Sequence, residues 1–282
     1  MGPTPAPLIG AYRECRRIAR RHSSSYSLAT RLLPADRRPH VYALYAFARV
    51  ADDIVDAPTG DPAGALDEFR RLVAQAINGG EARTPVLAAV ANTASVLAIP
   101  HEAFDRFFHS MEMDLTVHEY GTWDDLLGYM DGSAAVIGEM MLPILDPCDV
   151  ASALAPARAL GFAFQLTNFL RDVGEDLDRG RQYLPQADLV EFGVDLASRQ
   201  VTPSFRELMR FEIGRCRGLY RAAESGVALL PSRSARCVRT AGALYERILD
   251  EIEANGHDVF TRRAAVAPAR KLVLVASSAA RR

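Results

Sequence analysis

The first stretch whose residues could do chemistry is 47-FARVADDIVD-56, which ends an otherwise apolar run. On a helix its polar side chains fall at steps of three and four and form one stripe: Tyr45, Arg49, Asp52 and Asp56. Asp52 and Asp56 destabilise a helix by about 0.2–0.5 kcal/mol at this spacing, and acids at a helix C-terminus oppose its dipole. The stretch therefore predicts either a solvated helix end with aspartate caps or a cation site.

A second stretch, 160-LGFAFQLTNFLRDVGEDLDRGRQYLP-185, repeats this pattern. Its polar side chains step along one helix face at three, four and four residues: Gln165, Asn168, Asp172 and Asp176. Two acidic ends of apolar helices in one chain favour a single shared site over two separate solvated ends.

The candidate ligands are all oxygens, which suit Mg²⁺ or Mn²⁺ better than zinc or copper. Arg49 and Arg171 stand beside the two clusters and are suited to bind phosphate. The residues thus predict a phosphate ester held by Mg²⁺ ions in an apolar helical cavity. Such a site would ionise a diphosphate leaving group, and its apolar walls would hold a hydrocarbon chain and keep water from a carbocation.

The elements that position these clusters are expected to be helices, because strand patterns are nearly missing from the sequence and helix start and stop signals are frequent. We predict an all-α fold of ten or more helices around a central apolar cavity, in one domain over 1–282. Residues 57–64 and 180–193 are predicted to be irregular. The helices are expected at about 39–56, 84–97, 122–145, 149–172 and beyond, 202–230 and 232–255.

Composition excludes several partners. The formal net charge is −2, which does not favour nucleic acid. The four cysteines are scattered, so neither a disulfide framework nor a zinc site is expected. Unpaired cysteines fit a cytoplasmic location, which we therefore expect. Neither a signal peptide nor a membrane-spanning run is evident. The tail 271-KLVLVASSAARR-282 is expected to dock as a C-terminal helix, with contact to a membrane surface as the alternative.

The two motifs resemble those of the squalene/phytoene synthase family, over residues 12–273. The first reads D-D-x-x-D, and the second, 172-DVGED-176, is followed by 178-DRGRQYLP-185. Further similar blocks are 22-HSSSYSLATRLLP-34, 129-YMDGSAAVIGEMMLPIL-145 and 245-YERILDEIEANGHDVFTRRAAV-266. Within the family the chain is most similar to bacterial phytoene synthases.

The resemblance implies a prenyltransferase that condenses two geranylgeranyl diphosphates head to head. A cyclopropylcarbinyl diphosphate (prephytoene diphosphate) forms, ionises again, rearranges and loses a proton to give phytoene, in carotenoid biosynthesis. A squalene or dehydrosqualene synthase using farnesyl diphosphates is the alternative, and NADPH is expected only if the product is squalene. A non-catalytic assembly factor is an alternative of another class, which intact acidic motifs disfavour. The hydrocarbon product implies an enzyme that is peripheral to the inner membrane face, and the oligomeric state is unknown.

The resemblance also assigns roles to residues. The Mg²⁺ ligands would be Asp52, Asp53, Asp56, Asn168, Asp172 and Asp176. Contacts to diphosphate would come from Arg49, Arg171, Tyr245 and Arg262. The remaining substrate-lining residues would be His22, Ser23, Ser24, Ser25, Tyr26, Tyr45, Tyr129, Gln165 and Tyr183. The residues expected to be essential for catalysis are Asp52, Asp56, Asp172, Asp176, Tyr45 and Arg49.

Some of these assignments have simpler alternatives. Tyr129 could pack in the core, Tyr183 could order a loop, and His22 could cap a turn. Asp53 lies off the line of its two neighbours on a helix, so we expect it to matter less for metal binding. Asp131 and His257 depart from the family pattern, and Asp131 is expected to make one cavity wall more polar.

Overall fold

The computed structural model describes residues 6–56, 60–271 and 273, which contain twelve α-helices and no β-strand. An isolated bridge joins Glu119 and Gln182. The α-helices are α1 (Ala6–His22), α2 (Ser24–Thr30), α3 (Arg38–Val55), α4 (Pro62–Ile77), α5 (Pro85–Val96), α6 (His101–Met113), α7 (Trp123–Met130), α8 (Val136–Leu145), α9 (Val150–Asp178), α10 (Gln186–Phe192), α11 (Pro203–Val227) and α12 (Ser232–Ala254). A π-helical segment, η1 (Asp131–Ala135), joins α7 to α8, and η2 (Leu196–Ser198) is a 3₁₀ turn.

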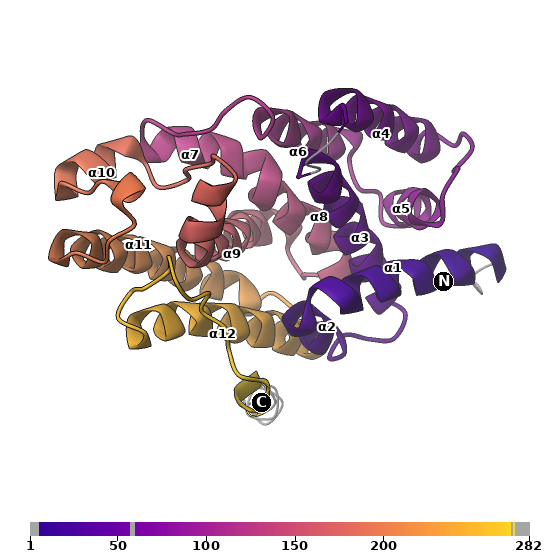
Figure 1. The fold of residues 1–282 in the computed structure, drawn as a ribbon. Helices are drawn as coiled ribbons and strands as arrows, with labels where there is room; N and C mark the ends of the chain where they lie inside the picture. Colours follow the sequence, from indigo (N-terminus) through magenta and orange to yellow (C-terminus); the bar gives the residue numbers. More distant parts are fainter. Residues whose placement is uncertain (1–5, 57–59, 272, 274–282) are drawn as a thin grey trace.

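The helices form two groups on either side of α8 and α9. In Figure 1 the indigo and purple helices α1 and α3–α6 lie on one side, and the orange and yellow helices α11 and α12 lie on the other. Helix α9 packs along α11 and also contacts α8, η1 and α12. Helix α8 in turn contacts α3 and α6, so α8 and α9 together connect the two groups.

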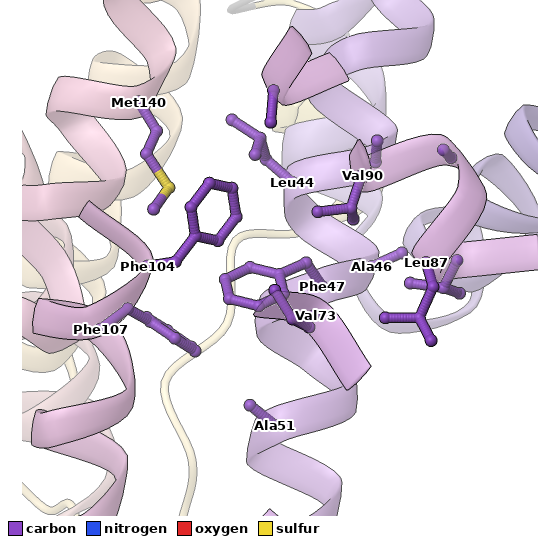
Figure 2. Packing of buried hydrophobic residues seen from close by; sticks show 14 of the residues in the cluster. Leu44, Ala46, Phe47, Ala51, Val73, Leu87, Val90, Phe104, Phe107 and Met140 are labelled. Atoms are coloured by element: carbon purple, nitrogen blue, oxygen red, sulfur yellow. The ribbon is translucent and has the colours of Figure 1, made fainter. Parts of the chain in front are cut away.

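Helix α3 carries the first acidic motif and is held by packing on several sides. The ring of Phe47 lies 4.7 Å from that of Phe107 and 5.3 Å from that of Phe104, measured between centroids. Leu44, Ala46 and Ala51 are also buried among neighbouring helices (Figure 2). The expectation of a buried helix over this stretch is confirmed, and its packing fixes where the aspartates at its end project.

The six helix starts that the sequence places are found in the structure, and at four of them a side chain accepts a hydrogen bond from the first turn. Thr84, Asp149 and Thr202 each accept a backbone N–H from three residues later. Thr122 forms a reciprocal capping box with Asp125. These caps satisfy N–H groups that have no partner within the helix.

Several expected boundaries differ. The helix expected over 122–145 is interrupted by the π-turn η1, where the carbonyl of Tyr129 accepts hydrogen bonds from the hydroxyls of Ser110 (2.8 Å) and Ser133 (3.2 Å). Both hydroxyls thus bond a carbonyl at the junction of α7 and η1, where the α-helical hydrogen-bond pattern gives way to the π-turn. Neither segment expected to be irregular is so throughout, since α4 begins within 57–64 and α10 occupies the second half of 180–193. Helix α11 ends at Val227 rather than near Leu230.

Two glycines let α9 approach η1 and α8 with backbone contact. A Cβ at Gly161 of α9 would lie 2.5 Å from the carbonyl oxygen of Ala134, and a Cβ at Gly138 of α8 would collide with the carbonyl oxygen of Ala157. Side chains at either position would force the elements apart. This close approach seats α9 directly on η1 and α8, and α8 in turn contacts α3.

Candidate active site

A cavity of about 910 Å³ lies between α2, α3, α8, α9, α11 and α12. This volume is near the upper end of the roughly 300–1,000 Å³ that is usual for ligand pockets. Helix α9 lines the cavity from Ala153 to Asp176, a length of about 34 Å at 1.5 Å per residue. Small and apolar residues line the part near the start of α9, and both acidic motifs lie near its other end. The apolar lining includes Ala29, Leu145, Ala153, Pro156, Ala157, Ala223, Val227, Leu230, Cys237, Val238 and Ala241.

In the first motif, the cavity is lined by Asp52 and Asp56 but not by Asp53. The side chain of Asp53 is 53% exposed and forms an ion pair with Arg49. Arg49 itself lines the cavity, as does Tyr45 one turn earlier. The placement agrees with the helical spacing, which sets Asp53 apart from its two neighbours.

In the second motif, all four residues of the expected stripe line the cavity: Gln165, Asn168, Asp172 and Asp176. Asp172 is held by two arginines. The Nε of Arg171 donates to its Oδ1 at 2.7 Å, and the Nε of Arg263 donates to the same oxygen at 2.8 Å. Burial alone would raise the pKa of Asp172, but these hydrogen bonds hold it below its ordinary value.

The two motifs are joined through the turn that follows the second one. The Nη1 of Arg181 donates to Oδ1 of Asp56 at 2.7 Å, and the Nη1 of Arg179 lies 3.4 Å from its Oδ2. Residues about 120 positions apart in the sequence therefore share one polar site at one end of the cavity.

Within the two acidic motifs, two carboxylates make no ion pair with another described residue: Asp52 and Asp176. The pKa of each is raised to about 7, chiefly by burial and also by neighbouring carboxylates. A cation would relieve this cost. No three acidic, His or Cys side chains in the described stretches converge on one point. Mg²⁺ suits such a donor set, because it usually takes one or two protein carboxylates and fills its shell with water and phosphate oxygens.

The expected substrate-lining residues of the N-terminal part also border the cavity. His22, Ser23, Ser25 and Tyr26 are among its lining residues. Ser23 also caps α2, since its Oγ accepts the N–H of Tyr26. The side chain of Ser24 lies outside the described residues, as does most of the tail after Lys271.

Four aromatic side chains cluster where α2, α3, α9 and α12 meet the cavity. The ring of Tyr26 lies 5.0 Å from that of Tyr245 and 5.9 Å from that of Tyr45, and Phe164 lies 4.6 Å from Tyr245. All four line the cavity. Their faces can stabilise positive charge on carbon.

A buried acid that the sequence analysis missed lies beside the first motif. Asp114 is 7% exposed, lines the cavity and accepts hydrogen bonds from the hydroxyls of Tyr129 (2.8 Å) and Tyr183 (3.1 Å). Burial raises its pKa to about 6. Both tyrosines line the cavity, so neither is confined to core packing or loop ordering. A usable signal was present, because Asp114 follows Phe107 and Met111 at steps of four and three, on the buried face of the amphipathic helix α6.

The structure corrects two further expectations of placement and locates His257, the other departure from the family pattern. Arg262 is exposed and does not line the cavity, whereas its neighbour Arg263 does and bonds Asp172. Asp131 is not a cavity wall residue, because its carboxylate is bound by Arg106 at 2.7 Å and also by Arg158. His257 has a left-handed backbone (φ 66°) and also lies outside the cavity lining.

Fold and site together define an all-α enzyme of the isoprenoid diphosphate class, with two acidic motifs at one end of an apolar cavity. The family model of squalene/phytoene synthase matches residues 19–270, and the chain belongs to this family.

Known relatives agree with this placement. The chain is 36% identical to phytoene synthase 3, chloroplastic, of Zea mays, covering 95% of this chain but 66% of that protein, just under two thirds. It is also 36% identical to phytoene synthase of Arthrospira platensis, covering 96% of this chain and 93% of that protein. Among solved structures, a dehydrosqualene synthase in complex with ligand superposes with a TM-score of 0.91 at 27% identity, covering 97% and 96% of the two chains.

Proposed function

We propose that this protein is a phytoene synthase that condenses two geranylgeranyl diphosphates head to head through prephytoene diphosphate. The observation that carries this proposal is that both acidic motifs lie at one end of a single cavity whose other end is lined by apolar residues. The relatives named phytoene synthase support the C20 substrate over the C15 one. Because the cavity draws lining residues from α1 to the segment after α12, we also propose that the chain acts as a single domain.

The acidic and basic residues at the polar end have different proposed roles. Asp52, Asp56, Asn168, Asp172 and Asp176 would hold Mg²⁺, which would neutralise the departing diphosphate. Arg49, Arg171 and Arg263 would contact the diphosphate oxygens, with Arg263 in place of Arg262. The tyrosines would face the carbocation, and the apolar lining would exclude water from it.

A dehydrosqualene synthase is the second candidate, because the solved structure of such an enzyme superposes closely. An assembly factor without catalysis is disfavoured, because all the candidate metal ligands of the two motifs line the cavity, with the exception of Asp53. No helix among the described residues is long and apolar enough to cross a membrane. We propose a cytoplasmic enzyme that delivers its hydrocarbon product at the inner membrane face.

The test is the condensation assay with C20 and C15 diphosphates supplied separately, with Mg²⁺ and without NADPH. Wild type should convert the C20 substrate to phytoene, and chelation of the metal should stop the reaction. Asp52→Ala and Asp172→Ala should each lose activity by at least about a hundredfold. The matched control is Asp178→Ala on the same helix α9, because Asp178 is exposed and pairs with Arg199 away from the cavity. Full activity in Asp52→Ala or Asp172→Ala would overturn the two-motif mechanism, and a product from C15 alone would move the proposal to the second candidate.

A further inference from the structure

One wall of the cavity near the acidic motifs is an aromatic cluster that rests on a single carboxylate. It consists of Tyr120, Tyr129, Phe169 and Tyr183. The rings of Tyr183 and Phe169 stack at 3.9 Å with an angle of 10° between them. Tyr129 lies 5.7 Å from Tyr183 at 29°. Of the four, all but Tyr120 line the cavity.

Asp114 is the polar anchor of this cluster. Its two oxygens accept one phenol hydroxyl each, at 2.8 Å from Tyr129 and at 3.1 Å from Tyr183. These tyrosines come from α7 and from the turn after α9, so the carboxylate ties two distant segments together. The positive charge of Arg181, which binds Asp56, lowers the pKa of Asp114 and so opposes part of the effect of burial.

This arrangement decides which way the two hydroxyl protons point. A buried phenol hydroxyl needs a hydrogen-bond partner, and without one it recruits water where space allows. Because Asp114 accepts both protons, neither tyrosine needs a water in the cavity. Water is also the nucleophile that would intercept a carbocation there, forming a C–O bond and releasing its proton to give an alcohol.

We propose that Asp114 is a positioning residue: it locks Tyr129 and Tyr183 so that the wall presents aromatic rings, and no ordered water, to the cationic intermediates. The inference rests on the proposed function and deepens it by assigning what protects the carbocations at this wall. Asp114 acts through the two tyrosines rather than on the substrate itself. Its loss should therefore change the fate of the intermediates more than the binding of the substrate.

The test measures kcat, KM and the partition of products for Asp114→Asn, an isosteric change that removes the charge. The product mixture is resolved into C40 hydrocarbon, released cyclopropylcarbinyl diphosphate and alcohols. We expect kcat to fall about tenfold with KM within about threefold of wild type, since hydrogen bonds to a charged group are lost. The share of alcohols and released intermediate should rise by at least about fivefold.

Matched controls separate this role from a loss of stability. Asp188 is also 7% exposed but bonds Arg215 outside the cavity lining, so Asp188→Asn should keep the wild-type partition even if its Tm falls. Tyr220 is buried and bonds Thr167 at 2.8 Å, also outside the lining, so Tyr220→Phe is the control for Tyr129→Phe and Tyr183→Phe.

The double variant Asp114→Asn with Tyr183→Phe gives a second, independent readout. Its kcat should lie within about twofold of that of Asp114→Asn alone, because both changes act on the same hydrogen bond, the one between Tyr183 and Asp114. The inference is overturned if folded Asp114→Asn keeps the wild-type kcat and partition, or if Asp188→Asn shifts the partition equally. Should Asp114→Asn not fold, unchanged partition in both tyrosine variants overturns it. A wild type that makes no C40 product would instead refute the proposed function.

Discussion

Gly174 lies inside the second acidic motif and offers a direct test of how the site is built. A Cβ there would lie 2.8 Å from the carbonyl oxygen of Val259 and 3.1 Å from Cα of Phe260. The segment after α12 thus rests directly on α9 at this point. In the same segment, four residues after Val259, the Nε of Arg263 donates to Asp172 at 2.8 Å. Gly174→Ala should therefore push the segment away and weaken this ion pair.

The size of the effect follows from two opposing terms. Replacing Gly by Ala inside a helix stabilises it by about 0.5–1 kcal/mol. Forcing a methyl group against the backbone of a packed segment costs about 1–3 kcal/mol. The first term is shared by Gly214→Ala on α11, where a Cβ would meet nothing within 4 Å. The difference between the two variants isolates the steric term, and at about 2 °C per kcal/mol it corresponds to about 2–6 °C in Tm.

Calorimetry and the condensation assay check both parts of this prediction. Gly214→Ala should melt at or above the wild-type Tm and retain activity. Gly174→Ala should melt about 2–6 °C below Gly214→Ala, and its kcat/KM should fall about tenfold through a weakened contact to diphosphate. Equal Tm values for the two variants, or a wild-type kcat/KM for Gly174→Ala, would refute the reasoning that the segment is seated on this glycine.

Two further predictions concern the first acidic motif. Asp53→Ala should keep kcat within about threefold of wild type, because the exposed side chain of Asp53 does not line the cavity. A loss as large as that of Asp52→Ala, measured in the same assay, would contradict this placement. Asp52→Asn should melt like wild type at pH 4 and above it at pH 8, both without metal. The pKa of Asp52 is raised from 3.8 to about 7, chiefly by burial, so the folded wild type loses stability as pH rises from about 4 to about 7. Equal Tm values at pH 8 would contradict a buried, unpaired carboxylate.

Helix positions and the shared acidic site could be predicted because they depend on local chemistry. Thr84, Asp149 and Thr202 are N-caps whose hydrogen bonds involve residues three positions away. The stripes that end at Asp56 and Asp176 follow from the 3.6-residue period of the helix. Two anomalies of one kind needed only the further assumption that they share a cation.

Features that depend on tertiary contacts could not be predicted. Whether Arg262 or Arg263 faces Asp172 depends on the path of an irregular segment, which has no period to fix it. The sequence shows that Asp131 departs from the family pattern. It does not show what binds this carboxylate, because the partners Arg106 and Arg158 come from other helices. The π-turn at η1 involves Ser110, which lies 19 residues from the Tyr129 carbonyl that it bonds.

The backbone contact between α9 and its neighbours also limits how this cavity can change in evolution or by design. At Gly161 and Gly138 the walls are main chain against main chain, so enlarging the cavity there would require whole helices to move. The walls formed by α2 and α12 contribute side chains instead, among them Ala29, Cys237 and Val238. Exchange of those side chains can lengthen or shorten the apolar end while the catalytic end stays in place. Libraries that aim to alter the chain length of the product should therefore vary α2 and α12 and leave both glycines untouched.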